Sequence, residues 1–545
     1  MVMVMPATAM VANSRRNEVY VKKMTTKLSL LLKRPKKIAP AISAGCLIVV
    51  AFGASSVSAQ AVDAPEGVRP RLSIVPRVSI SETWTDNVRL STNDRQSELI
   101  TVISPGIRVS ADRGRLKGYL DYALNARYFA QNTSGADVQN ALTAFGTLEA
   151  VENWAFIDLN AGISQQATSA LGTPPAGLTA INGNQNETAT VRLSPYLRGK
   201  LLSSVDYEAR YSLTANRNKA SSASDSTSRD GAVRLSGRGS GARLGWSFAA
   251  QQQNTSFNTG RNTESDQITG GLSYAVLPQL NLSISGGRDS DNFTTADRQS
   301  STSFGYGISW VPSETTSISA ARENRRFGES FSVSAAHRTA RTAWRFTDSK
   351  NIVNPAAQTG LVTLGSAFGI FFDQFAGAEP DPVKRAALVN SFLQANGIDP
   401  NSSVTTSFAT SAVSVIRRQD LSFSLFGIRD TVTFTATRSE SSRVDTLSSA
   451  VDDLSNGAVI RQSGLSVNFS HRLTPNASMS ILASVGQSSD SLGLQDTNNR
   501  SVNLSFSTKL GPKSTVAVSA RHVVFDSNTT PYTESAVTGA LNVQF

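Results

Sequence analysis

Short stretches that strictly alternate apolar and polar residues, separated by tight turns, constrain the fold of this chain most. Near the end of the chain, Val502, Leu504 and Phe506 alternate with polar residues, Gly511-Pro512-Lys513 turns the chain, and the alternation resumes at Val516. A period of two on both sides of a tight turn predicts a β-hairpin.

The same unit recurs along the chain, and its turns are marked by proline. Pro278, Pro312, Pro475 and Pro512 each stand close to the junction of two alternating stretches. Pro278 and Pro312 are 34 residues apart, and Pro475 and Pro512 are 37 apart. This spacing holds two strands of about ten residues with one short and one longer connection.

Polar stretches rich in Ser, Thr, Asn, Asp and Gly alternate with these short turns. They cover residues 168–187, 216–229 and 287–298, and they indicate solvent-exposed loops. Short turns at one end and longer loops at the other are typical of outer-membrane barrels, whose short turns face the periplasm. A soluble β-sandwich also alternates in this way, but its turns do not separate so consistently by length.

The N-terminal segment predicts a secretory signal peptide. Seven Lys and Arg over residues 22–37 precede an apolar stretch over residues 38–57, and Val57-Ser58-Ala59 offers a cleavage site. We expect residues 1–59 to be removed, with the true start at Met1 or Met24, and residues 60–545 to form the mature protein. No later segment approaches the ~20 apolar residues of a spanning helix, so any membrane span must consist of strands.

The formal charge of +11 comes mainly from this leader. Residues 1–59 hold nine Lys or Arg and one Glu, which leaves a mature net charge of only +3. So small a net charge does not indicate a basic surface that binds nucleic acid. The single Cys46 also lies in the leader, with apolar residues after it, so we expect neither disulfides nor lipidation in the mature protein.

Together these features predict an all-β fold, a transmembrane antiparallel β-barrel of roughly 20–22 strands with a short helical insertion. We expect it in the outer membrane of a Gram-negative bacterium. Aromatic residues stand where strands meet turns, which favours an interfacial girdle over ordinary core packing. These residues are Trp154, Trp310, Trp344, Phe346 and Phe545.

Residues 347–405 break the rhythm of the barrel and form the predicted insertion. Asp381-Pro382 reads as a helix N-cap and first-turn proline, and Gly397 reads as the residue that ends the helix. Between them, Val383, Ala386, Val389 and Leu393 form an apolar stripe. An apolar segment over residues 368–375 precedes this helix and is its candidate packing partner.

Strand parity makes the insertion informative. With turns near residues 112–113, 152–153 and 195–199, and a fourteenth strand over residues 330–346, the pattern yields about 21 strands, whereas a closed bacterial barrel has an even number. In the first alternative, a strand that runs away from the periplasm, which we call a rising strand, is hidden in or beside residues 347–412, and the helix lies outside the wall or at a rim. In the second, the insertion threads the lumen as a plug. The parity argument favours the rim.

The last segment alternates up to the final residue. Val537, Leu541, Val543 and Phe545 share one face with Gly539, and Ala540 stands where the common pattern of such segments has glycine. The segment resembles the C-terminal signal that the barrel assembly machinery reads. We therefore expect these four large apolar residues to form an assembly signal.

The sequence indicates no catalytic or metal-binding constellation. His337, His471 and His522 are its only histidines, and none has a second His, Cys or carboxylate at ligand spacing. Asp289-Ser290-Asp291 and Asp452-Asp453 would suit Ca²⁺, but solvated loops are the commoner explanation. We expect no enzyme activity and no cofactor.

Arginine dominates the mature basic residues, with 36 Arg against seven Lys. The guanidinium group binds carboxylate and phosphate in bidentate fashion. Lumenal Arg would therefore suit a path for an acidic polysaccharide, and loop Arg would suit lipopolysaccharide phosphates. Near charge balance favours a third interpretation, a ladder of Arg paired with Asp and Glu inside the barrel.

Several segments are similar to a single family of proteins. They are Val75 to Ile80, Trp84 to Val88, Ser104 to Ile107, Leu120 to Leu124, His337 to Thr339 with Trp344 after Phe327-Gly328, Asp381 to Gly397, and Gly427 to Thr431. Over residues 70–545 the chain resembles the outer-membrane β-barrel family associated with PEP-CTERM/exosortase systems, with Asp430 where the family pattern has Asn. The resemblance implies a porin-like barrel encoded beside exopolysaccharide genes.

Two functions follow as expectations. The first is a porin-like channel that serves exopolysaccharide production or export, and the second is a non-conducting structural or adhesive barrel that binds polysaccharide or lipopolysaccharide. The expected partners are outer-membrane lipid and lipopolysaccharide, the barrel assembly machinery and exopolysaccharide, with no nucleic acid.

Overall fold

The computed structural model describes residues 72–545, except 132, 175–179, 202–203, 220–223, 240–242, 355–367, 369–371, 373–380, 396–407, 409, 411, 446, 448–451, 456–457 and 494. The chain divides into two units, Met1–Arg69 and Pro70–Phe545, and only the second contains described residues. The expected signal peptide and its cleavage site lie outside them.

The second unit consists of 22 antiparallel strands and one described helix of any length, α3 (Pro382–Ala395). The alternating sequence stretches become these strands because a pleated strand sends successive side chains to opposite faces. The strands are β1 Leu72–Thr85, β2 Glu98–Arg113, β3 Leu116–Phe129, β4 Asp137–Val151, β5 Ala155–Ala167, β6 Gln185–Leu201, β7 Val205–Asn218, β8 Ser226–Arg238, β9 Leu244–Phe257, β10 Thr263–Leu277, β11 Leu280–Asp291, β12 Gln299–Ser313, β13 Thr316–Arg325, β14 Gly328–Arg338, β15 Thr342–Val353, β16 Ser414–Phe426, β17 Asp430–Arg443, β18 Val459–Thr474, β19 Ala477–Asp490, β20 Asp496–Gly511, β21 Ser514–Ser527 and β22 Tyr532–Gln544.

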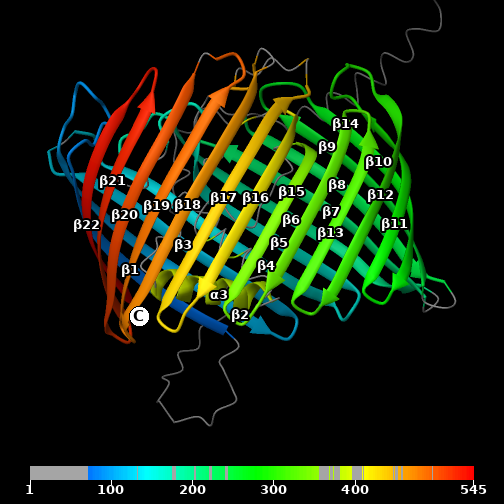
Figure 1. Cartoon of the computed structure of the whole chain (residues 1–545), viewed down its shortest axis with the longest axis horizontal. Helices are drawn as coiled ribbons and strands as arrows, with labels where there is room; N and C mark the ends of the chain where they lie inside the picture. Colours follow the sequence, from blue (N-terminus) through cyan, green and yellow to red (C-terminus); the bar gives the residue numbers. More distant parts are fainter. Residues whose placement is uncertain are drawn as a thin grey trace, which may run out of the picture. The chain divides into compact units, whose positions relative to one another are not determined.

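Each strand pairs with its neighbours in sequence, and the last strand pairs with the first (Figure 1). The register of this closing seam runs from Arg77↔Gln544 to Thr85↔Ala536. Closure removes both sheet edges, so every strand finds backbone partners on two sides. The predicted closed antiparallel barrel is confirmed, and its strand number is at the upper end of the expected range.

The two faces of the wall differ in polarity. Outward positions carry exposed large apolar side chains on every strand except β13 and β14, such as Ile74 on β1, Ile284 on β11 and Val502 on β20. Inward positions are polar, with Thr83, Asn125 and others buried in the lumen. A barrel embedded in lipid requires an outward apolar band of this extent, whereas exposing the same band to water would be unfavourable.

Connections separate by length as expected, except that the two-residue connection between β13 and β14 lies at the long-loop end. Short turns such as residues 278–279, 475–476 and 512–513 lie at one end, which we call the short-turn end. The connections over residues 86–97, 168–184 and 444–458 lie at the opposite, long-loop end. Both Leu72, where the wall begins, and Phe545 lie at the short-turn end.

Two expected features of the wall were wrong. The predicted turn at residues 195–199 belongs to β6, which continues to Leu201, and β7 begins at Val205. Pro195 is accommodated because it pairs with Ile157 of β5 while the register with β7 skips Ser194 and Pro195, so its missing N–H costs a single rung.

The expected fourteenth strand over residues 330–346 is two strands, β14 and β15. They are joined by a tight turn in which the backbone N–H groups of Arg341 and Thr342 both donate to Thr339 Oγ1, at 3.3 and 3.0 Å. β15 is the rising strand that was missing from the expected count of about 21, and it brings the number of strands to 22.

All five tryptophans lie on the outward face and are exposed. Trp154, Trp246, Trp310 and Trp344 lie near the short-turn end, where Trp154 Nε1 donates to Tyr207 Oη at 2.8 Å. Amphipathic rings favour the membrane interface, where one edge meets headgroups and the other meets acyl chains. The predicted aromatic girdle is confirmed at this end. No described helix is long and apolar enough to cross a membrane.

Candidate functional site

The lumenal face of the wall holds a ladder of ion pairs. Asp121 accepts from Arg108 at 2.8 Å and also from Arg77, and Glu534 accepts from Arg521 at 2.8 Å. Further pairs join Arg210 to Asp158, Arg325 to Glu323 and Arg418 to Asp420. Paired guanidinium and carboxylate groups satisfy each other in an interior that is only partly hydrated. The ladder interpretation is therefore confirmed for these arginines.

Helix α3 lies inside the barrel, toward the short-turn end (Figure 1). Val383, Ala386 and Val389 are buried in one cluster with Phe368, Phe372 and two lumenal side chains, Tyr119 of β3 and Phe145 of β4. Asn390 Nδ2 donates to Tyr119 Oη at 2.7 Å. Val383, Ala386 and Val389 of the predicted apolar stripe thus pack on the wall, and the side chain of Leu393 lies outside the described part of the structure.

This position corrects the expectation for the insertion. The rising strand exists, yet the described helix lies within the lumen and not outside the wall. The parity argument failed because the insertion leaves β15 and enters β16 at the same, long-loop end. An insertion whose two ends meet the wall at the same end adds no strand, so α3 can lie beside the short turns without changing the strand count.

The N-terminus of α3 is capped as the sequence predicted. Asp381 Oδ1 accepts hydrogen bonds from the backbone N–H groups of Val383 and Lys384, at 2.9 and 3.2 Å. Asp381 Oδ2 also lies 3.5 Å from Lys117 Nζ, at the start of β3. Burial acts to raise the pKa of Asp381, but these hydrogen bonds and the Lys117 charge together hold it below its ordinary value. Gly397 and the remainder of the predicted helix end lie outside the described residues.

We expect Asp381→Ala to cost the helix about 1 kcal/mol without affecting the wall. Hydrogen exchange of the amides over residues 383–395 should become faster at neutral pH. Because the pKa of Asp381 is lowered by folding, its contribution is present above the unfolded pKa of about 3.9 and is lost as the pH falls through the folded pKa. Parent and variant should therefore converge in acid, and a difference that persists there would contradict this capping role.

Loops at the long-loop end fold over the lumen and contact one another. Ile181 N donates to Val88 O at 3.0 Å, and the Ile181 side chain packs against the buried cluster that holds Val88 and lumenal Ile100. Ala170 N donates to Asp453 Oδ2 at 2.5 Å, which joins the β5–β6 loop to the β17–β18 loop. The described loops therefore narrow this end, while α3 occupies part of the other.

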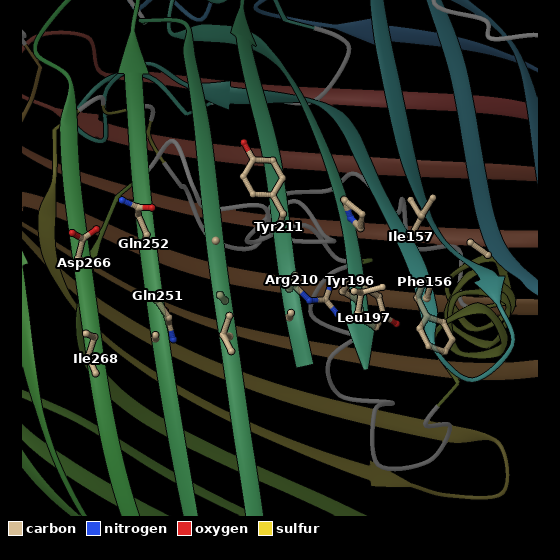
Figure 2. A pocket seen from close by; sticks show the side chains of 18 residues that line it. Phe156, Ile157, Tyr196, Leu197, Arg210, Tyr211, Gln251, Gln252, Asp266 and Ile268 are labelled. Carbon is tan, nitrogen blue, oxygen red and sulfur yellow. The ribbon is translucent and has the colours of Figure 1, made fainter. Parts of the chain in front are cut away.

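An aromatic pair on the lumenal wall carries two arginines. Phe156 of β5 and Tyr196 of β6 stack with ring centroids 5.1 Å apart. The Arg198 guanidinium lies 4.2 Å from the Phe156 centroid, and that of Arg210 lies 3.9 Å from the Tyr196 centroid, as Figure 2 shows for Arg210. We call this group the arginine platform. Phe156, Tyr196 and Arg210 of this platform line part of a hollow of about 830 Å³ whose lining extends from β4 to β10.

The two platform arginines differ in charge balance. Arg210 is held by Asp158 at 2.7 Å and Glu208 at 3.1 Å. Arg198 is exposed, and within the described part of the chain no carboxylate lies within ion-pair distance of it. Register places Arg198 opposite Glu208 and Glu208 opposite Arg234, which is also exposed and lacks a described ion pair. The lumenal wall thus presents two uncompensated guanidinium groups near the short-turn end.

Sequence reasoning did not single out these residues. Composition showed the excess of arginine, but pairing depends on which side chains share a face and a register. The usable signal was local: Tyr196 and Arg198 alternate on β6, and Glu208 and Arg210 alternate on β7. Alternation predicts that each pair shares a face, but it does not identify the strands that flank them.

The histidines lie on the outward face, in small polar pairs. His337 Nδ1 lies 2.9 Å from Thr316 Oγ1, His471 Nδ1 lies 2.6 Å from Asp430 Oδ1, and His522 Nδ1 lies 2.9 Å from Ser535 Oγ. Among the residues that the structure describes, no group of His, Cys, Asp or Glu could hold a metal ion.

The two acidic segments have structural roles in the described residues. Asp291 accepts from the backbone N–H of Phe293 at 3.0 Å, and Asp452 accepts from that of Leu454 at 3.1 Å. These bonds shape the loops that follow, as Asp commonly does in turns.

The predicted assembly residues lie on the closing strand. Val537 and Leu541 are exposed on the outward face of β22, opposite Trp84 and Ile80 of β1. Val543 lies opposite Val78, and Phe545 N donates to Pro76 O at 3.0 Å. Their role in assembly stays a prediction.

No protein-family model and no curated protein matches this chain. Among solved structures, the apoprotein form of the FrpB iron transporter from Neisseria meningitidis is 11% identical, with a TM-score of 0.47 over 86% of this chain and 81% of that chain. The siderophore receptor PirA from Pseudomonas aeruginosa is 9% identical, with a TM-score of 0.41 over 86% and 80%. OccK2 (OpdF) from Pseudomonas aeruginosa, in complex with glucuronate, is 9% identical, with a TM-score of 0.33 over 87% and 98%.

The class of the protein follows from its own wall. A closed antiparallel barrel with an outward apolar band, an aromatic girdle and a polar lumen is a transmembrane β-barrel of the outer-membrane type.

Proposed function

We propose that this protein is an outer-membrane channel through which acidic polysaccharide passes during exopolysaccharide export. The observation that carries the proposal is the pair of uncompensated arginines, Arg198 and Arg234, on the lumenal wall near the short-turn end. Short turns face the periplasm in barrels of this type. The arginines would therefore stand at the entrance for a polymer that leaves the cell.

The chemistry of the arginine platform suits a uronic acid chain. A guanidinium group binds a carboxylate with two parallel hydrogen bonds, and the Phe156 ring beneath Arg198 holds that group flat. Because the stacked rings already order the arginine side chains, those side chains lose little conformational entropy when a carboxylate binds. The association with PEP-CTERM/exosortase systems, expected from sequence resemblance, agrees with such a substrate.

A test compares block of the channel by acidic and neutral oligosaccharides. Oligogalacturonate added on the short-turn side should reduce the conductance of refolded protein at a concentration about tenfold below that of maltooligosaccharide, since one good charged contact is worth about 1.4 kcal/mol or more. The Arg198→Gln/Arg234→Gln variant should lose this difference.

Arg113→Gln serves as the matched control, because Arg113 lies on the outward face at the same end of the barrel. It should leave the preference for the acidic sugar unchanged. Equal block by both sugars in the parent protein would contradict the proposed substrate class.

A second candidate is a non-conducting structural barrel that binds polymer at its surface. The bridged loops at the long-loop end and α3 within the lumen favour it. The two candidates separate by conductance, because a structural barrel should stay closed to ions even when the insertion is shortened.

A further inference from the structure

A group of basic side chains lies on the outward face, three to five residues from the ends of their strands at the long-loop end of the wall. Lys350 of β15 stands directly opposite Arg417 of β16, and both project outward with Trp344 and Leu421. Arg438 of β17 lies two residues further along, diagonal to Arg417. We call these three residues the outer basic cluster.

Acidic neighbours account for only part of this charge. Asp348 accepts from Arg417 at 3.0 Å and from Gln419 Nε2 at 2.9 Å, and Glu440 lies opposite Arg417, with its carboxylate 3.9 Å from Arg461 Nε. Arg322 pairs with Glu329 nearby. Among the residues that the structure describes, no carboxylate lies within ion-pair distance of Lys350 or Arg438.

Like charges directly opposite each other on a sheet destabilise it, and residues at this spacing have Cβ atoms about 4.5–5.5 Å apart. Lys350 and Arg417 form such a pair, and the Phe331 ring, which continues their row on β14, lies 5.4 Å from the Arg417 guanidinium carbon. An anion between the basic groups would relieve the repulsion. A phosphate suits this position because it accepts two parallel hydrogen bonds from an Arg guanidinium and is attracted by the compact positive charge of Lys.

The surface next to the cluster indicates which phosphate binds there. Toward the short-turn end the same strands present exposed Phe346, Leu421 and Phe434. The cluster thus borders the apolar band, where a lipid places its headgroup above its acyl chains. Longer loops of such barrels face outside the cell, so this border meets the outer leaflet.

The geometry points to a binding site for a phosphorylated lipid of the outer leaflet, with its phosphate held by Lys350, Arg417 and Arg438 and its acyl chains on the apolar band. The site lies on the opposite face of the wall from the lumen. It therefore does not depend on the proposed channel.

The test measures lipid retained by purified, folded protein in detergent, by native mass spectrometry. Bisphosphorylated lipid A is the probe, and lipid A stripped of its phosphates and inorganic phosphate are the comparison ligands. The parent protein should retain the phosphorylated lipid, and the Lys350→Gln/Arg438→Gln variant should retain at least tenfold less. Arg417 is left intact so that its ion pair with Asp348 is preserved in the variant.

The matched control is Arg113→Gln/Lys513→Gln, which removes the same charge at the short-turn end and should retain lipid as the parent does. Heat-modifiable gel mobility shows that each variant is folded. Because Arg438→Lys keeps the positive charge, this variant should retain most of the phosphorylated lipid. Equal retention by the parent and the cluster variant would overturn the site. Retention of dephosphorylated lipid A, or full displacement by inorganic phosphate, would overturn a lipid phosphate as its ligand.

Discussion

Excising residues 373–398 should raise the single-channel conductance of the refolded barrel at least about twofold, because a helix with its side chains is about 10–12 Å wide and occupies the lumen near the short turns. The wall should still assemble, since β15 and β16 pair without interruption from Thr342↔Leu425 to Val353↔Ser414. Planar-bilayer recording of both proteins measures the change. The loops at the long-loop end remain in place and limit the increase.

Two point variants separate the role of the helix from that of the excision. Val389→Asp places a charge in the buried cluster with Phe145, which should release α3 from the wall. The conductance should then rise or fluctuate between levels. Leu388→Asp changes a neighbouring side chain that is exposed, and it should behave as the parent does. If the excised protein and Val389→Asp both conduct like Leu388→Asp, the helix does not restrict the pore.

Replacing Phe545 by Asp should lower the amount of folded protein in the outer membrane several-fold. Phe545 directly follows the closing strand β22, is 63% exposed, and its backbone N–H donates to Pro76 O. A charge near the membrane interface costs a barrel only about 0–1 kcal/mol. A large loss would therefore reflect failed assembly and not an unstable product.

Leu510→Asp provides the matched comparison. Leu510 is 65% exposed near the short-turn end of β20, so the same charge enters a similar position outside the terminal strand. Its yield of heat-modifiable protein should stay close to that of the parent. A Phe545→Asp protein that assembles as well as Leu510→Asp would show that the terminal residue is not part of an assembly signal.

Local patterns predicted the wall well because its hairpins are local structures. The turns at residues 278–279, 475–476 and 512–513 carry proline or glycine between alternating stretches, and each appears where expected. The helix cap at Asp381 is equally local, since the acceptor lies two and three residues from its donors. Such features depend on neighbours in sequence, which the chain itself displays.

The errors arose where a local signal was missing or ambiguous. The turn at Thr339 contains neither glycine nor proline and is stabilised by a threonine hydroxyl, so alternation appeared to run through it into Trp344 and Phe346. Pro195 suggested a turn, but a strand tolerates proline where one rung of the ladder is skipped.

The candidate site was less accessible to sequence reasoning than the wall. The arginine platform joins Phe156 to Tyr196, which are 40 residues apart in the chain and meet through the register of β5 and β6. The packing of α3 joins Val389 to Tyr119 and Phe145, far earlier in the chain. Neither meeting leaves a trace in residue spacing, and covariation between homologous sequences would be needed to detect it.

The insertion that leaves and re-enters the wall at one end has an evolutionary consequence. Because it contributes no rung between β15 and β16, its length and sequence can drift, shorten or be exchanged by recombination while the 22-strand frame keeps its register. Selection on what the lumen admits can then act on this segment independently of selection on insertion into the membrane. Relatives with the same frame should therefore diverge first between residues 354 and 413.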